Sequence, residues 1–367
     1  MGAGVLGCAT ALALSRRGVS VVLLEAADEP AWAASGTNSG ILHTGFDSVP
    51  GELETQLILR SAALRDPVLR ALRVPVLRCG ARLHPRGARD DVVGALAANA
   101  EQNGVEVLWR KDGALKVPGE AVTDPVSYTL ALALAARRHE ADLRMRFEVT
   151  DIQRDQGGVS LASSGGEAVR CRLVVNCAGL HADTVARLAG DDSFGIYPRK
   201  GEFLVFEPPR GERLDRILLP VPTERTKGVL VFPTVDGKVI AGPTAVDQID
   251  KSDWSVRPQA RQEIHPQAAT MWPPLEGAEP IAAYAGLRPA GRGINYLIEP
   301  SRVCPELVNV AAIRSTGLTA ALGIAEYVCG IVERLGVRLT GERPLEPGQP
   351  PRSPVPWWRR AAERGSS

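Results

Sequence analysis

Residues 2–7 read Gly-Ala-Gly-Val-Leu-Gly, a G-x-G-x-x-G spacing that constrains the fold of this chain more than any other feature. In a dinucleotide site the first glycine makes a tight turn, the second lets the backbone approach a pyrophosphate, and the third lets helix pack on strand. The helix predicted over 8–17 would face the phosphates with free N–H groups and its positive dipole end. An apolar run over 19–24 then ends in Glu25, 21 residues after Gly4, where a carboxylate can accept from ribose hydroxyls.

The simpler alternative is a tight loop before a surface helix, since glycine-rich turns are common. The helix, the second strand and the acid follow in register, and this order favours a nucleotide site. A buried strand of ~5–6 residues should precede such a loop, but only Met1 precedes Gly2. We therefore expect the first Rossmann strand to be missing, because the chain starts too late or is truncated, and we expect cofactor binding to be weakened.

Composition excludes several classes of protein. The 367 residues suggest two domains or one large one, and the net charge of +1 predicts neither nucleic acid nor an anionic membrane as a partner. The six cysteines form no C-x-x-C pair and no Cys/His cluster, so we expect no metal site and reduced thiols in the cytoplasm. No apolar run reaches the ~18–20 residues of a membrane span.

The order of predicted elements indicates an α/β fold with an α+β second domain. Nucleotide-type α/β segments at both ends enclose short β-rich runs, and Asp236-Gly237 marks a hairpin between two of these runs. We predict a discontinuous Rossmann-like domain over 1–75, 140–195 and 300–340, interleaved with an antiparallel-sheet substrate domain over 76–139 and 196–299. The Pro-, Gly- and Arg-rich tail over 341–367 is predicted to be disordered. Its Trp357–Arg360 segment is a candidate contact with a membrane surface, with a solvated tail or packing against the body as alternatives.

The chain resembles the FAD-dependent oxidoreductases of the D-amino-acid-oxidase-like superfamily from Gly2 to about Leu335. Within that group it looks closest to the L-2-hydroxyglutarate and glycerol-3-phosphate dehydrogenase branch. It lacks the cysteine-rich C-terminal domain of some glycerol-3-phosphate dehydrogenases, which argues against a built-in iron–sulfur relay. Five motifs in the right order carry the resemblance: Asn-Ser-Gly-Ile-Leu-His-Thr-Gly at 38–45, Val-Val-Asn-Cys-Ala-Gly at 174–179, Arg-Lys-Gly-Glu-Phe at 199–203, Ala-Gly-Leu-Arg-Pro at 285–289, and the helix at 313–327.

This resemblance implies non-covalent FAD as the cofactor. The turn over 315–319 would open a helix whose free N–H groups stabilise negative charge on the flavin N1–C2=O edge, although it also reads as an ordinary N-cap. Val149 would make only backbone contacts, to adenine. The implied FAD contacts are Gly2, Gly4, Gly7, Glu25, Asn38, Ser39, Gly40, Val149, Ala178, Gly179, Gly317, Leu318 and Thr319.

Three side chains are candidates for the chemistry. His43 could act as a general base for a hydroxyl proton, or could only shape the pocket through hydrogen bonds. The guanidinium of Arg288 could clamp a substrate anion bidentately, or could form a surface ion pair. Lys200 could hold a water or a substrate oxygen near the flavin, or could be a solvated lysine at a strand edge.

The resemblance implies oxidation of a small anionic 2-hydroxy acid or related alcohol by hydride transfer to flavin N5. An amino acid or amine oxidase acting on a glycine- or sarcosine-like substrate fits the Gly-Leu-Arg-Pro segment equally well, because a carboxylate clamp serves both. An alternative of another class is a truncated, catalytically impaired fragment. The electron acceptor stays open among oxygen, a quinone and a carrier protein.

Overall fold

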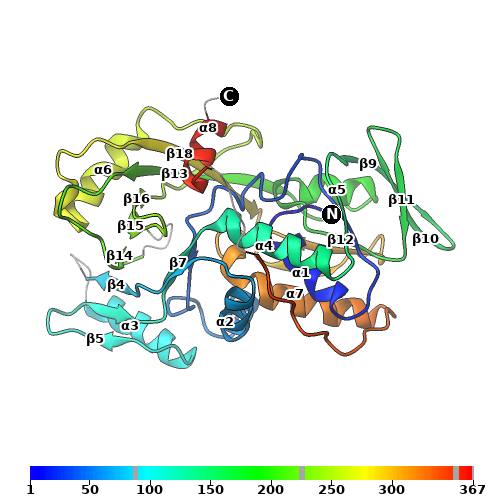
Figure 1. Ribbon diagram of the computed structural model, residues 1–367, viewed down its shortest axis with the longest axis horizontal. Helices are drawn as coiled ribbons and strands as arrows, with labels where there is room; N and C mark the ends of the chain where they lie inside the picture. Colours follow the sequence, from blue (N-terminus) through cyan, green and yellow to red (C-terminus); the bar gives the residue numbers. More distant parts are fainter. Residues whose placement is uncertain (86–89, 223–227, 350–354, 366–367) are drawn as a thin grey trace.

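The computed structural model describes residues 1–85, 90–222, 228–349 and 355–365. Its ribbon falls into two lobes, with α1, α7 and β12 on one side and α6, β14 and β4 on the other (Figure 1). The helices are α1 (Val5–Ser15), α2 (Leu53–Ala71), α3 (Asp90–Gln102), α4 (Pro125–Arg138), α5 (Ala182–Leu188), α6 (Ala260–Met271), α7 (Gly317–Arg334) and α8 (Trp357–Arg364), with 3₁₀ turns at Gly179–His181 and Pro273–Leu275.

The first lobe, here called the Rossmann-like lobe, is built on short parallel strands. β1 (Val22–Leu24) pairs in parallel with β8 (Asp142–Arg144), and β12 (Val174–Asn176) pairs in parallel with β20 (Leu307–Ala311). β19 (Leu297–Pro300) extends the second pair antiparallel. Helices α1, α4 and α7 share one apolar core beside these strands, and their alanine-rich faces allow close packing.

The backbone of Met1 and Gly2 lies between these two parallel pairs. The Met1 amine donates to the Val175 carbonyl at 2.7 Å, and the Met1 carbonyl accepts from Cys177 at 2.9 Å. On the other side Gly2 N donates to the Leu24 carbonyl at 2.8 Å. Met1 and Gly2 thus join β1 to β12, and no strand precedes α1 among the residues described.

The second lobe, here called the sheet lobe, is a large and mostly antiparallel sheet. Its longest pairing runs from Ile196↔Gly291 to Val205↔Ala282, between β13 (Ile196–Phe206) and β18 (Ala282–Gly291). The sheet continues from β13 in the order β16 (Val239–Gly242), β15 (Leu230–Pro233), β14 (Ile217–Pro220), β4 (Ala81–His84), β6 (Leu115–Val117) and β5 (Leu108–Trp109), with β17 (Val246–Asp247) on its other edge. Helix α6 covers the β13–β16 region with a separate apolar cluster.

Two small sheets complete the fold. β2 (Ile41–Leu42), β7 (Ala121–Thr123) and β3 (Val76–Leu77) form one, and β9 (Val149–Asp155), β10 (Gly158–Ser163) and β11 (Ala168–Cys171) form the other. Between β8 and β9 the chain leaves the parallel pair at Arg144 and enters the antiparallel sheet at Val149.

Local sequence signals are confirmed where they rest on neighbouring residues. The Asp124 carboxylate accepts from Val126 N and Ser127 N at 2.9 Å each, which caps α4 as the Asp-Pro pair predicts. Gly237 adopts φ +85° in the hairpin between β15 and β16. The α/β class with a second, antiparallel domain is confirmed.

Two predicted boundaries differ from the structure. Helix α4 was expected in the first segment of the substrate domain, over 76–139, but its Tyr128 and Leu132 pack with Leu12 of α1 in the Rossmann-like lobe. The tail was expected to be disordered, yet residues 357–364 form α8, whose two tryptophans are buried against the sheet lobe. Apolar burial of Trp357 and Trp358 outweighs the polar composition that suggested disorder.

Candidate active site

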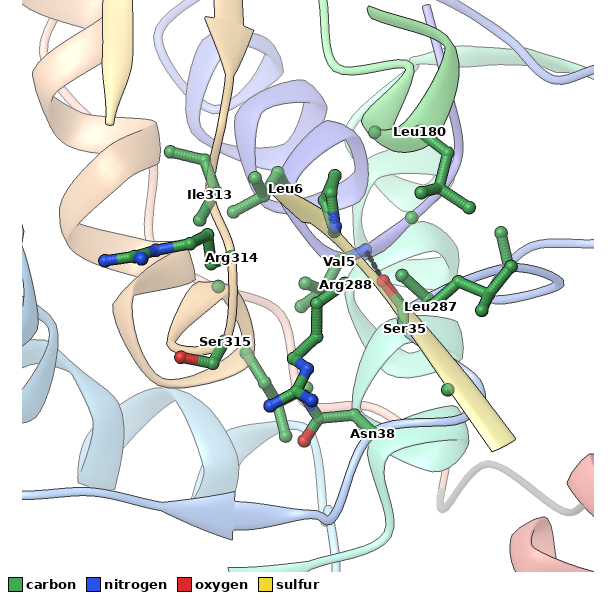
Figure 2. A pocket seen from close by; sticks show the side chains of 18 of the residues that line it. Val5, Leu6, Ser35, Asn38, Leu180, Leu287, Arg288, Ile313, Arg314 and Ser315 are labelled. Carbon is green, nitrogen blue, oxygen red and sulfur yellow. Dashed lines mark hydrogen bonds between the residues drawn. The ribbon is translucent and has the colours of Figure 1, made fainter. Parts of the chain in front are cut away.

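A cavity of about 1090 Å³ lies where the two lobes meet. Its volume is at the upper end of the ~300–1,000 Å³ usual for ligand sites, so it has room for a large cofactor. The walls come from the glycine loop and start of α1, the segment after β1, the ends of β12 and β20, and the facing strands β13 and β18. Figure 2 shows Val5, Leu6 and Ser35 on one side of this pocket and Ile313, Arg314 and Ser315 on another.

The glycine loop packs too closely for side chains. A Cβ at Gly7 would lie 1.8 Å from the Gly2 carbonyl oxygen, and a Cβ at Gly2 would lie 2.5 Å from the Cys177 carbonyl oxygen. Helix α1 begins at Val5 without a side-chain cap from Gly4. Val5 N donates to Ser35 Oγ at 2.9 Å, a bond drawn in Figure 2. The helix therefore presents its positive end to the cavity, with the first of its free amides held by Ser35.

Glu25 follows β1 and lines the same wall. Its two carboxylate oxygens accept from Ala3 N at 2.5 Å and from Ala27 N at 2.9 Å. Each oxygen keeps a lone pair for a further donor. The position and the chemistry match a carboxylate that accepts from ribose hydroxyls.

A second helix N-terminus opens onto the cavity from α7. Gly317 and Leu318 line the wall, and Thr316 gives the helix no side-chain cap. The Thr316 hydroxyl is instead engaged by Glu54 and by the Tyr296 hydroxyl, each at 2.7 Å. The ordinary N-cap alternative is therefore wrong, and the first-turn amides of α7 remain directed at whatever fills the cavity.

His43 lies on the cavity wall and is held by a buried carboxylate. Its Nδ1 is 3.0 Å from Glu120 Oε2, and Glu120 is fully buried. The other Glu120 oxygen accepts from Thr44 N at 2.6 Å and from Thr44 Oγ1 at 2.9 Å. The His43 amide donates to Thr319 Oγ1 at 3.1 Å, which fixes the loop on α7.

The pKa of Glu120 fits an ionised carboxylate. Burial alone would raise this pKa, but the facing His43 and the hydrogen bonds from His43 and Thr44 bring it below its ordinary value. An ionised Glu120 accepts from Nδ1–H and so selects the His43 tautomer whose Nε2 carries a free lone pair. The pair is thus arranged as a base with its orienting acid.

Arg288 on β18 lines the cavity, but most of its guanidinium is hydrogen-bonded to backbone carbonyls. Its Nε donates to the Arg199 carbonyl at 3.1 Å, and its Nη2 donates to the carbonyls of Lys200 at 3.1 Å and Thr244 at 2.8 Å. Among the residues described, only Nη1 has no hydrogen-bond partner. Burial lowers the pKa of Arg288 to about 10, and the positive charges of Arg199 and Arg314 act in the same direction. An anion near Nη1 would relieve this surplus of positive charge.

Lys200 does not reach the cavity. Its Nζ donates to Asp253 Oδ2 at 2.8 Å and to the Ser255 carbonyl at 2.9 Å, and its side chain is 2% exposed. Alternate residues of a strand face opposite sides, and the flanking Arg199 and Gly201 take the cavity side. The catalytic interpretation of Lys200 is therefore corrected, and so is the solvated alternative, because the ammonium is buried in an ion pair.

The remaining predicted contacts divide into wall and support. Gly7 packs beneath Gly2, the Gly40 carbonyl accepts from Thr123 N at 2.8 Å, and Thr319 supports His43. In the part of the chain that is described, no group of three His, Cys, Asp or Glu residues could hold a metal ion. The predicted residues found on the wall are Gly2, Gly4, Glu25, Asn38, Ser39, His43, Val149, Ala178, Gly179, Arg288, Gly317 and Leu318.

Sequence reasoning missed Glu120 and Arg364. Glu120 lies 77 residues from its partner His43, and no spacing rule links the two. Arg364 lines the cavity from the end of the segment expected to be disordered. A buried glutamate beside Gly119 and an arginine following a Trp-Trp pair carry no recognisable signal in one sequence.

Comparison with known proteins agrees with this geometry. The profile of the DAO family, described as FAD dependent oxidoreductase, matches residues 1–331. A glycerol 3-phosphate dehydrogenase of Caloramator mitchellensis is 29% identical over 367 residues, covering 95% of this chain and 76% of that protein. The mitochondrial L-2-hydroxyglutarate dehydrogenase of Mus musculus is 31% identical over 278 residues, covering 67% of this chain and 60% of that protein.

Among solved structures, the L-alpha-glycerophosphate oxidase of Mycoplasma pneumoniae with FAD bound superimposes with a TM-score of 0.86. It is 26% identical, and the match covers 95% of this chain and 96% of that one. The chain belongs to the DAO family of FAD-dependent oxidoreductases. The N-terminal ends of α1 and α7 and the carboxylate after β1 fit FAD as its cofactor.

Proposed function

We propose that this enzyme oxidises a small anionic secondary alcohol, such as glycerol 3-phosphate or a 2-hydroxy acid. Bound FAD supplies the hydride acceptor, through flavin N5. The observation that carries the proposal is the His43–Glu120 pair on the cavity wall. The proposal is consistent with the relatives, whose names include glycerol 3-phosphate dehydrogenase and L-2-hydroxyglutarate dehydrogenase.

An alcohol needs a base that an amine does not. A hydroxyl group keeps its proton at neutral pH, so its oxidation to a carbonyl requires removal of that proton as hydride leaves carbon. Nε2 of His43 can accept this proton, and Glu120 stabilises the resulting imidazolium at 3.0 Å. Such general-base assistance is worth about 10²–10⁴ in rate.

The cavity also favours a negative charge on the substrate. Arg199, Arg288 and Arg314 line it together. Burial depresses the pKa of Arg288, and no carboxylate of the described residues is hydrogen-bonded to it. Because two of its nitrogens serve backbone carbonyls, Arg288 would offer a single Nη1 contact rather than the fork expected from the sequence. The rigid backbone bonds would hold that contact in place.

An amino acid or amine substrate would fit the anion site equally well, but its oxidation would not need His43 as a base. A primary or secondary amine can enter as the neutral form drawn from solution, so it needs no paired imidazole and carboxylate. The alcohol and amine hypotheses therefore differ in the role that they give to His43.

Anaerobic mixing of the holoenzyme with candidate substrates separates them. Glycerol 3-phosphate and L-2-hydroxyglutarate should bleach the visible flavin absorbance, and glycine and sarcosine should not. His43→Asn should retain its FAD and lose about 10²-fold or more in bleaching rate. Bleaching by an amine alone, or an unchanged rate in His43→Asn, would refute the proposal. Repeating turnover with oxygen, a quinone analogue and a dye acceptor would identify the electron acceptor.

A further inference from the structure

Helix α8 lies outside the family match, which ends at residue 331. Figure 1 shows it as the red helix beside β13 and β18. Trp357 is buried edge-on against Tyr284 of β18, with ring centroids 5.5 Å apart. Trp358 Nε1 donates to Asp236 Oδ2 at 2.9 Å in the β15–β16 hairpin. These contacts fix α8 to the sheet lobe.

The other face of α8 reaches toward the Rossmann-like lobe. Arg360 forms an ion pair with Glu29, which follows β1. One helical turn later, the Arg364 guanidinium lies between two indoles, 4.8 Å from the Trp32 ring and 3.9 Å from the Trp254 ring. All three of Arg364, Trp32 and Trp254 line the cofactor cavity. The helix therefore spans the mouth of the cavity between the lobes.

Among the residues that the structure describes, Arg364 is a cation without a counter-ion. Its Nη1 is buried and has no hydrogen-bond partner among the residues described, and no salt bridge to it is formed there. Burial, and then the neighbouring charge of Arg360, lower the pKa of Arg364 to about 10. Because Arg364 lines the cavity, a ligand that brings an anion into it would offset this charge. The two tryptophan rings hold the planar group in position for that ligand.

The location identifies the anion. Ala31 N donates to the Ala3 carbonyl at 3.1 Å, and Ser35 Oγ accepts from Val5 N at 2.9 Å. Trp32 lies between these two anchors, so the segment under Arg364 rests on the glycine loop. That loop and the α1 N-terminus are where the pyrophosphate of a dinucleotide binds. Within the described part of the chain, no hydrogen bond or ion pair joins Arg364 to His43 or Arg288, which mark the substrate region.

We propose that Arg364 binds the FAD pyrophosphate and that α8 thereby closes the cofactor groove. The inference rests on FAD as the cofactor and is independent of which substrate is oxidised. The negative pyrophosphate of FAD would then be bound from two sides, by the N-terminus of α1 in the Rossmann-like lobe and by Arg364 of α8 on the sheet lobe.

The test measures FAD affinity without turnover. Apoprotein of the wild type, Arg364→Gln and Arg364→Lys is titrated with FAD while flavin fluorescence is followed. Arg364→Gln should raise the Kd at least tenfold, about 1.4 kcal/mol at 25 °C, and Arg364→Lys should raise it less because the charge remains. Arg359→Gln is the matched control, since Arg359 is exposed on the same helix and does not line the cavity; its Kd should stay within about twofold.

Thermal melts separate ligand binding from a structural role. Apoprotein of Arg364→Gln should melt at or above the wild-type temperature, because an unmatched buried cation has been removed, while its FAD-induced rise should be smaller. ADP, which carries the pyrophosphate without the flavin, should stabilise wild-type apoprotein more than adenosine does, and Arg364→Gln should lose that preference.

Two results would overturn the proposal. One is an unchanged FAD Kd in both Arg364 variants. The other is a raised substrate KM with an unchanged FAD Kd, which would assign Arg364 to the substrate.

Discussion

Replacing Glu120 with glutamine should switch His43 to its other neutral tautomer, with the proton on Nε2, without changing the shape of the site. The Thr44 amide and hydroxyl both donate to one Glu120 oxygen, at 2.6 and 2.9 Å. A glutamine must therefore point its carbonyl at Thr44 and its NH₂ at His43 Nδ1. That donor forces the proton of the neutral imidazole onto Nε2, so the atom facing the cavity can no longer act as a base.

The expected loss follows from the charge pair. When His43 takes the substrate proton, a positive ring faces the Glu120 carboxylate across 3.0 Å between Nδ1 and Oε2. Two unit charges centred about 4 Å apart interact by about 4 kcal/mol at an effective dielectric constant of about 20. Since ~1.4 kcal/mol corresponds to a factor of ten, Glu120→Gln should slow flavin reduction by about 10³. The His43 side chain is 15% exposed, so screening by solvent reduces this figure only in part.

The assay is anaerobic stopped-flow reduction of the FAD holoenzyme by the best substrate. Thr44→Val is the matched control, because it removes one hydrogen bond to Glu120 and leaves the Glu120–His43 contact; it should lose less than about tenfold. FAD content and far-UV circular dichroism check that each variant folds. The double variant His43→Asn/Glu120→Gln should be no slower than His43→Asn alone, since the two residues act as one unit.

Wild-type reduction rates in a folded, FAD-loaded Glu120→Gln would refute this reasoning. Additive losses in the double variant would also refute it, because they would show that Glu120 acts on the reaction by a route other than His43.

Arg288→Lys should raise the substrate KM about 10- to 100-fold and change the FAD Kd much less, because lysine loses the planar group that β18 holds in place; equal changes in both constants would argue against a substrate role. Asp253→Asn should destabilise the protein at neutral pH but not near pH 2. The hydrogen bond from Lys200 lowers the pKa of Asp253 from 3.8 to about 2. The stabilisation by ionised Asp253 is therefore present above the unfolded-state pKa and is lost as pH falls through the folded-state pKa. Urea melts of both proteins across this pH range measure this stabilisation, and a pH-independent difference between them would contradict the prediction.

The features that the sequence predicted best depend on residues close together in the chain. The glycine loop, α1, β1 and Glu25 occupy the 24 consecutive residues 2–25, and steric rules at each step leave them one arrangement. The Asp124 cap and the Gly237 turn follow from the same local rules. Together with the family resemblance these signals predicted the fold class, and Gly2, Gly4 and Glu25 among the expected contacts line the cavity.

The features that the sequence alone left undecided depend on which distant segments meet. Alternation along β13 places Arg199 and Lys200 on opposite faces, but only the pairing with β18 decides which face meets the cavity. The partner of His43 is 77 residues away because β2 and β7 pair side by side.

The same reason governs α4 and α8. The local sequence predicted a helix for α4 and disorder for the segment that contains α8. The surface that each helix covers is decided instead by apolar contacts with residues far away in the chain. Trp357 shows this most clearly, because its burial against Tyr284 brings Arg364 to the cofactor cavity. The sequence by itself determined a nucleotide-binding loop and its strand-helix frame; long-range packing decided which charged groups surround the cofactor and the substrate.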